Sequence, residues 1–154
     1  NDYLVAIGIE PTEPNTGYGY LQLGHEIAPG VNELRRFTEK PSRDVAEEFL
    51  RTGNYLWNAS MFVWRASVFR RALEASAPEI ASLADRIVSS GDPGKRVEHY
   101  EAMPSISIDY ALMEKATRVA AIRGDFGWSD VGTFEALERV GVPVAELLKN
   151  VSGV

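Results

Sequence analysis

The apolar run from Tyr3 to Ile9 constrains the fold most, because it is too continuous for a strand that faces water. Strands covered on both faces read as unbroken apolar runs, and they lie in sheets that helices cover. Further short apolar runs follow, separated in places by stretches with apolar residues at helical spacing. The pattern predicts an α/β fold. Strands are expected at residues 3–9, 20–23, 34–41, 54–65, 119–122 and 125–128, and helices at 45–52, 67–76, 78–89, 96–103 and 133–140, with a polar link at 25–31.

Length and charge limit the functions open to this chain. Its 154 residues suit one domain. A net charge of −6 argues against a nucleic-acid partner, which needs a basic stripe, but one or two local cations suffice for a small phosphorylated ligand. The chain has no cysteine, which favours a reducing compartment. No apolar run approaches the roughly 20 residues of a membrane helix. We therefore predict a cytoplasmic protein without a membrane partner.

Asp130 stands in a turn with two glycines, Phe126-Gly127-Trp128-Ser129-Asp130-Val131-Gly132, between an apolar run and a helix-like stretch. Glycine lacks a Cβ, so the backbone can turn sharply there and approach a ligand closely. Open α/β sheets bind ligands at strand-to-helix turns, where an aspartate can hold Mg²⁺ together with substrate phosphates. Alternatively, Asp130 caps the helix that starts near Gly132. Its position alone leaves both interpretations open.

A glycine-rich stretch, Gly17-Tyr18-Gly19, precedes the second predicted strand. It lacks the third glycine and the helix that a dinucleotide-binding fingerprint requires. One interpretation is a turn with packed aromatic rings. The other is that Gly19 lets a ligand lie against bare backbone N–H, with a tyrosine ring as a wall.

Glu39 and Lys40 end the third predicted strand, directly before Pro41. As a solvated pair at a strand end they would contribute little to stability. In a crevice, the carboxylate would accept hydrogen bonds from sugar hydroxyls and the ammonium would neutralise a phosphate.

Two further polar residues stand in or beside apolar segments. Asn58 interrupts an apolar strand, and an unpaired buried amide costs about 1–3 kcal/mol. It must therefore bond neighbouring backbone or point at a ligand hydroxyl. Asp109 falls in the first turn of a predicted helix that Ser105 caps, where a carboxylate suits the helix dipole.

Five segments, taken in order, resemble the second half of the catalytic domain of the mannose-1-phosphate guanylyltransferases, within the sugar-nucleotidyltransferase superfamily. The resemblance covers residues 3 to about 139, and the Tyr-Leu-Trp-Asn and Trp-Ser-Asp-Val-Gly sequences point to the mannose branch. The matching segments are Pro11–Tyr20, Phe37–Pro41, Gly53–Phe62, Ser107–Lys115 and Phe126–Gly132.

The resemblance implies a reaction in which mannose 1-phosphate attacks the α-phosphorus of GTP, giving GDP-mannose and pyrophosphate with Mg²⁺ as cofactor. It implies that Gly19 and Glu39 contact the sugar and that Asn58 bonds a sugar hydroxyl. Lys40 would contact the sugar phosphate, and Asp130 would be one of two aspartates that carry the metal. The predicted catalytic residues are Lys40 and Asp130, and the predicted substrate-binding residues are Gly17, Tyr18, Gly19, Glu39, Lys40, Asn58 and Asp109.

The resemblance also implies an incomplete enzyme. The family's glycine-rich nucleotide loop and its first Mg²⁺ aspartate lie N-terminal to the matched segment, so we expect most of the GTP site to be missing and the chain alone to be inactive. We expect residues 1–140 to form the sugar-phosphate half of the catalytic domain, and the tail at 141–154 receives no role. Positions 59 and 60 read Ala-Ser where the family commonly has Ser-Gly.

The expected architecture is a Rossmann-like sandwich, with a mixed, mainly parallel sheet between helices and without its first strands. Such a truncated sheet would expose an edge that a second copy could pair with, giving a homodimer. Two alternatives stay open, namely a nucleotidyltransferase for another hexose 1-phosphate and a non-catalytic domain that binds sugar phosphates.

Overall fold

The computed structural model describes residues 2–132 and 134–144, and the chain divides into two compact units between Gly124 and Asp125. The first unit contains β1 (Leu4–Ile9), β2 (Tyr20–Ala28), β3 (Val31–Thr38), α1 (Arg43–Thr52), β4 (Tyr55–Val63), α2 (Ala66–Ser76), α3 (Pro78–Ser89), α4 (Pro93–Glu101), the π-helix η1 (Asp109–Met113) and β5 (Val119–Gly124). The second unit contains α5 (Phe134–Arg139).

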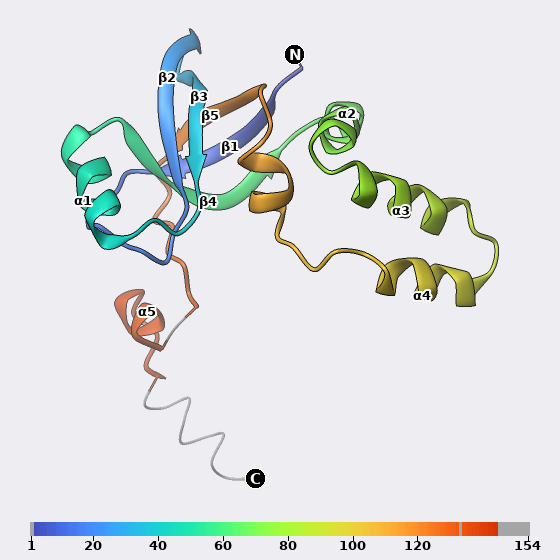
Figure 1. Cartoon of the computed structure of the whole chain (residues 1–154). Coiled ribbons are helices and arrows are strands. Elements are labelled where there is room, and N and C mark those ends of the chain that lie inside the picture. The colour runs from blue at the N-terminus through green and yellow to red at the C-terminus, as the bar shows by residue number, and fades with distance from the viewer. Residues whose placement is uncertain (1, 133, 145–154) are drawn as a thin grey trace, which may run out of the picture. The chain divides into compact units, whose positions relative to one another are not determined.

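The five strands of the first unit close into a barrel in the order β1-β4-β2-β3-β5, with β5 returning to β1 (Figure 1). Only β1 and β5 pair in parallel among these strands, and the other four pairings are antiparallel. The sheet is mixed, as predicted, but the prediction that it is mainly parallel is wrong for these strands. For β2 and β3 the reason is their hairpin, whose tight turn forces antiparallel pairing.

The β2–β3 hairpin also overturns the polar link expected at residues 25–31. β2 continues to Ala28 and pairs with Val31, so that only Pro29 and Gly30 connect the strands. Gly30 has φ +72°, and proline followed by such a glycine is the sequence of a type II turn. The outer half of this ribbon is partly exposed to solvent, so its strands carry polar residues that sequence patterning assigned to a loop.

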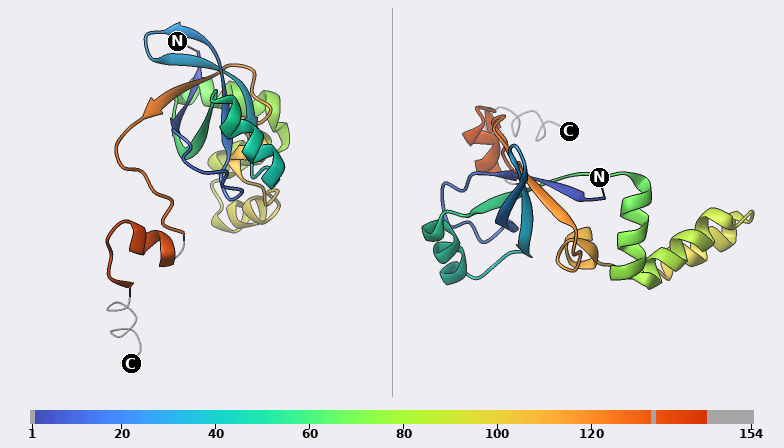
Figure 2. Two further views of the ribbon diagram at one scale, coloured as in Figure 1. Left: turned by 90° about the vertical axis from the view of Figure 1, so that its left-hand side faces the viewer. Right: turned by 90° about the horizontal axis from the view of Figure 1, so that it is seen from above.

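Helices lie on two opposite sides of the barrel, α1 on one and α2 to α4 on the other (Figures 1 and 2). Side chains from all five strands, α2 and η1 form the main core. On the α1 side, Phe49 stacks on Tyr55 with ring centroids 3.9 Å apart and lies 5.3 Å from Tyr20. The buried members of the main core are Leu4, Ala6, Leu21, Phe37, Leu56, Val68, Leu112, Met113, Val119 and Ala121.

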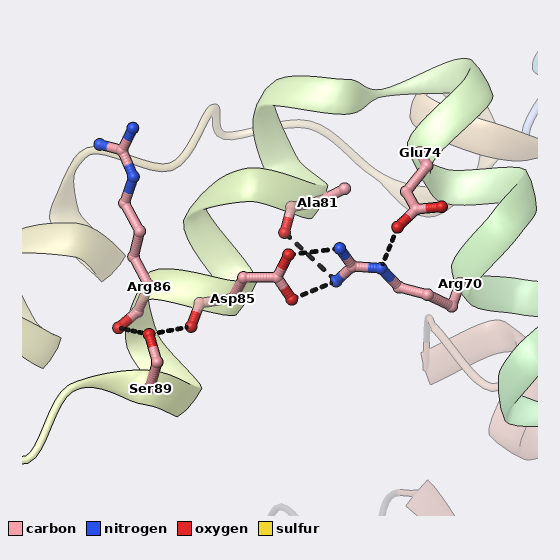
Figure 3. Close-up of polar contacts among 6 residues, drawn as sticks. All are labelled: Arg70, Glu74, Ala81, Asp85, Arg86 and Ser89. Carbon is pink, nitrogen blue, oxygen red and sulfur yellow. Dashed lines mark hydrogen bonds and ion pairs between the residues drawn. The ribbon is translucent and has the colours of Figure 1, made fainter.

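Arg70 joins α2 to α3 through its guanidinium group (Figure 3). Both terminal nitrogens contact the carboxylate of Asp85, and Nε donates to Oε1 of Glu74 at 2.8 Å. A fourth contact runs from Nη1 to the carbonyl oxygen of Ala81 at 3.4 Å. Bidentate contacts of arginine with a carboxylate fix orientation as well as distance. Arg70 therefore helps to fix the orientation of α2 relative to α3.

The helices predicted from apolar spacing are confirmed within a few residues at their ends. The segment around Asp109 differs, because η1 is a π-helix, closed by a bond from the Glu114 N–H to the Asp109 carbonyl at 2.9 Å. Residues 125–128 do not form the predicted strand piece, since β5 ends at Gly124 and Gly127 adopts φ +69°. Most of the predicted tail, residues 145–154, lies outside the described residues.

The barrel bears on two further predictions. β5 pairs with both β1 and β3, so these five strands do not leave the open sheet edge from which a homodimer was predicted, and the homodimer stays a prediction. Within residues 2–132 and 134–144, the structure contains no helix with the length and apolar character needed to cross a membrane.

Gly8 is a core position at which a side chain has no room. A Cβ built there would lie 2.6 Å from the Cβ of Leu56, a fully buried residue of β4. We expect Gly8→Ala to lower the free energy of unfolding by about 1–3 kcal/mol, the usual cost of overpacking. Denaturant titration measures this change. The matched control is Gly91→Ala, where an added Cβ meets nothing within 4 Å, and equal midpoints for both variants would contradict the expectation.

Candidate functional site

Strand register brings three of the predicted site residues together. Tyr20 in β2 lies opposite Thr38 of β3 on one side and Trp57 of β4 on the other. The preceding residue, Gly19, therefore meets the residues that follow these two partners, Glu39 and Asn58. A bond of 2.7 Å from the Asn58 N–H to the Gly19 carbonyl extends the β2–β4 pairing by one step.

Gly19 allows an approach that no other residue type would permit. A Cβ at this position would lie 2.6 Å from Oε2 of Glu39 and 3.2 Å from the Cβ of Asn58. The Glu39 carboxylate thus rests directly against the glycine backbone. The sequence predicts Gly19 as a place where a ligand could meet bare backbone, and the structure shows Glu39 close to that backbone.

The Asn58 side chain is held in one orientation. It is 4% exposed, its Nδ2 donates to Oδ1 of Asp109 at 3.2 Å, and its Oδ1 accepts the Ser60 N–H at 3.1 Å. Asp109 therefore does more than suit a helix dipole, because it bonds a residue 51 positions away.

A bulge in β4 produces this arrangement around Asn58. Between Ala6 and Gly8 of β1, the partner in β4 changes from Phe62 to Asn58, so β4 contains two additional residues there. Ser60 lies within the bulge and adopts φ +55°, a left-handed conformation that favours glycine. Bulges are frequent beside binding sites because they re-aim side chains.

The turn after β3 has a strained backbone. Lys40 adopts φ +45° and directly precedes Pro41, although residues before proline favour extended conformations. Its Nζ lies 3.5 Å from Oε1 of Glu39. The Lys40 side chain is 60% exposed and that of Glu39 is 10% exposed, so the ammonium group remains accessible to an anion while the carboxylate is largely enclosed.

Acidic neighbours surround Glu39. Burial raises the pKa of its carboxyl group, the charge of Asp109 raises that pKa further, Lys40 opposes the shift and Glu114 adds to it. The backbone N–H of Glu39 also donates to Oε1 of Glu114 at 3.1 Å. A carboxylate in such surroundings is a strong hydrogen-bond acceptor, suited to hydroxyl groups.

Sequence reasoning did not single out Glu114. It lies five residues after Asp109, and the π-helix bond between these two residues places them one turn apart. An α-helical pattern relates positions three and four apart, so the expected helix gave no reason to group the two acids.

The predicted aromatic wall is Tyr18, which directly precedes Gly19 in the chain. Tyr18 is half-buried, and its ring meets that of Trp57 edge-on with centroids 5.1 Å apart. Gly17 is exposed, and its N–H donates to Oδ1 of Asn15 at 2.8 Å. Tyr18 thus packs against an aromatic ring of β4, as in the interpretation of a turn with packed rings, whereas Gly17 belongs to a turn closed by an asparagine side chain.

Asp130 belongs to the second compact unit, where its side chain is exposed. Residues 131 and 132, which follow it, are not helical, so Asp130 does not stand at the N-cap of a helix. Among residues 2–132 and 134–144, no group of three histidine or acidic side chains is arranged to hold a metal. A single accessible carboxylate still fits Mg²⁺, which takes only one or two carboxylates and completes its shell with water and phosphates.

The first unit also contains a cavity of about 480 Å³, which is lined by residues other than those of the candidate site. Its lining includes Leu4, Arg71, Lys115 and Arg118, and none of the predicted site residues. The cavity borders the C-terminal end of α2 at Ser76, where free carbonyl groups carry partial negative charge. Two of its cations have partners within the chain: Nη2 of Arg71 lies 3.3 Å from Oδ1 of Asp2, and the Arg118 guanidinium lies 5.0 Å from the centroid of the Tyr3 ring.

The chain belongs to the nucleotidyl transferase family, whose profile matches residues 1–146. The mannose-1-phosphate guanylyltransferase of Sinorhizobium fredii (strain NBRC 101917 / NGR234) is 41% identical over 139 residues, covering 87% of this chain and 27% of the relative. The mannose-1-phosphate guanylyltransferase of Escherichia coli (strain K12) is 35% identical over 153 residues, covering 93% of this chain and 32% of the relative.

A solved structure agrees with these relatives. The crystal structure of mannose-1-phosphate geranyltransferase from Thermus thermophilus superimposes with a TM-score of 0.82 at 37% identity, covering 91% of this chain and 40% of that one. The family resemblance read from the sequence motifs is therefore confirmed, as is a mixed α/β fold. The chain spans about a third or less of the length of these two curated relatives.

The charge on Glu39 should make stability depend on pH. Because the folded state raises the pKa of this carboxyl group above 4.5, the folded state binds its proton more tightly than the unfolded state does. Stability therefore falls as pH rises from the unfolded value through the folded one. We expect Glu39→Gln to be more stable than the wild type at neutral pH and to lose this advantage below pH 4.5.

Thermal unfolding followed across this pH range measures the Glu39→Gln effect. Glu98→Gln, at an exposed position of α4, controls for removing one negative charge from a chain of net charge −6. An advantage of Glu39→Gln that is absent at neutral pH, or that equals that of the control, would contradict the assigned cause.

Ser60 offers a second test of the site's backbone. Glycine adopts φ +55° without strain and keeps the N–H that Asn58 accepts. We expect Ser60→Gly to raise the free energy of unfolding by up to about 1 kcal/mol. In contrast, Ser105→Gly, in a loop without positive φ, should lower it because glycine has more conformational freedom when unfolded. Chemical denaturation distinguishes the two signs, and destabilisation by both substitutions would refute the strain at Ser60.

Proposed function

We propose that this chain forms the sugar-phosphate side of a mannose-1-phosphate guanylyltransferase. The whole reaction would join mannose 1-phosphate to the guanylyl group of GTP, giving GDP-mannose and pyrophosphate. The observation that carries the proposal is the convergence of Gly19, Glu39 and Asn58 through one strand register, with the Lys40 ammonium beside them. The names of the relatives support this choice of substrate.

The chemistry of these residues suits a phosphorylated hexose. A hexose presents hydroxyl groups that donate hydrogen bonds, and the enclosed Glu39 carboxylate and the Asn58 amide oxygen accept them. The exposed Lys40 ammonium would neutralise the phosphate, which is then placed beside the sugar. In this arrangement the sugar phosphate is oriented for attack, and positioning supplies a large part of the rate enhancement in group transfer.

We assign Asp130 to Mg²⁺ on the basis of its exposed carboxylate in a turn with two glycines. When bound, such an ion would neutralise phosphate oxygens and accept charge that develops on them. The residues described above would bind and orient the sugar phosphate, and Lys40 would hold its negative charge.

Other features of the whole enzyme are part of the same proposal. We expect GTP to bind mostly to residues that the matched relatives carry outside this segment, and therefore expect no GDP-mannose formation by this chain alone. The absence of cysteine favours a cytoplasmic location. A homodimer remains a prediction without a defined surface.

Calorimetric titration of the 154-residue chain with mannose 1-phosphate tests the proposal. We expect binding by the wild type, weaker binding of glucose 1-phosphate, and a loss of at least about tenfold in Gly19→Ala, because the added Cβ displaces the Glu39 carboxylate. Gly91→Ala is the matched control, since its Cβ meets nothing within 4 Å.

Each other outcome of the titration decides against part of the proposal. Equal binding of both sugar phosphates would indicate a nucleotidyltransferase for another hexose. No binding by the folded wild type, or equal affinities in Gly19→Ala and Gly91→Ala, would remove the site. Formation of GDP-mannose by the isolated chain would contradict the expected division of the enzyme.

A further inference from the structure

The Glu39–Lys40 turn needs a restraint that the β2–β3 hairpin does not supply. β3 ends at Thr38, so the turn lies beyond the last strand pair, Tyr20 with Thr38. Lys40 is held at φ +45° in front of a buried Pro41. Residues in such sparsely populated conformations cost of the order of 1–3 kcal/mol and persist only where the surroundings enforce them.

Glu114 provides a contact at this point. Its Oε1 accepts the backbone N–H of Glu39 at 3.1 Å, across 75 residues of sequence. A charged acceptor makes a stronger bond to a backbone N–H than a neutral one. Glu114 is the C-cap residue of η1. Without its carboxylate, the Glu39 N–H would have to turn to solvent, and the Glu39–Lys40 turn would lose its bond to this end of η1.

The segment that carries Glu114 is firmly anchored. Leu112 and Met113, which immediately precede it, are 0% and 1% exposed and belong to the main core. At the other end of the same π-helix, Asp109 accepts a bond from Nδ2 of Asn58 at 3.2 Å. One short rigid element therefore contacts both polar parts of the candidate site, the amide in β4 and the turn after β3.

We propose that Glu114 is a positioning residue that fixes the Glu39–Lys40 turn for ligand binding, and that η1 acts as the common support of this turn and of Asn58. The inference rests on the proposed function for its ligand, but its structural part does not. Glu114 acts through the backbone of Glu39 and needs no contact with the substrate.

Two substitutions separate the roles of the Glu114 side chain. Glu114→Gln keeps an oxygen that can accept the Glu39 N–H but removes a negative charge that raises the pKa of Glu39. Glu114→Ala removes the acceptor as well. Glu98→Ala, on the exposed surface of α4, is the matched control.

Hydrogen exchange at the Glu39 amide tests the support directly in the 154-residue chain. We expect exchange to be roughly tenfold faster in Glu114→Ala, and close to the wild-type rate in Glu114→Gln and Glu98→Ala. Unchanged exchange in Glu114→Ala would overturn the inference whatever the ligand is.

Titration with mannose 1-phosphate over a range of pH tests the positioning role. We expect affinity to fall several-fold in Glu114→Ala and to be retained in Glu114→Gln, with the acid limb of binding moved to lower pH, because Glu39 ionises more readily without the neighbouring charge. Faster exchange with unchanged affinity in Glu114→Ala would overturn the positioning role. Faster exchange in a chain whose wild type binds no mannose 1-phosphate would refute the proposed function but leave the structural support intact.

Discussion

The candidate site depends on the register of one residue, Tyr20, which pairs with Thr38 and Trp57 at the same time. A shift of one position in either pairing would turn the following side chains to the other face of the sheet. The shared register instead places Gly19 between Glu39 and Asn58. Tyr20 is fully buried, and its hydroxyl donates to the Asn15 carbonyl at 2.9 Å. The buried ring thus secures the pairing from inside the protein, while the polar residues lie one step further along each strand.

Several features of the site reduce the stability of the fold. The positive-φ residues other than glycine among residues 2–132 and 134–144 are Lys40 and Ser60, and each lies within two positions of Glu39 or Asn58. Glu39 ionises in largely enclosed surroundings that contain two further carboxylates, those of Asp109 and Glu114. Strain and a largely enclosed charge are tolerated where the local geometry serves a purpose other than folding. The strained residues and the enclosed charge gather at one place, an observation that does not depend on any resemblance between sequences. They identify the same part of the molecule as the family motifs do.

Sequence patterning predicted the elements better than their pairing. Apolar spacing placed α1, α2 and α3 almost at their observed bounds, because each helix buries one face. It missed the outer half of the β2–β3 hairpin, where exposed strands carry polar residues, and it assumed parallel pairing that the Pro29-Gly30 turn forbids. At the site, Glu39, Lys40 and Asn58 stood out as polar residues next to apolar strands. Glu114 did not, since its contact with Glu39 requires a π-helix and a separation of 75 residues that local patterns do not encode.

The closure of the barrel has a consequence for how the chain reaches its native state. β1 pairs in parallel with β5, and Leu4 lies opposite Val119, so the ends of the first unit must meet before the barrel exists. Contacts between residues so far apart in the sequence form slowly, because the entropy of loop closure is lost before the contact is gained. During synthesis, β1 emerges from the ribosome long before β5 and has one of its two neighbours missing. The apolar strand β1 therefore keeps one edge unpaired until β5 has been made, and an exposed strand edge of this kind favours aggregation.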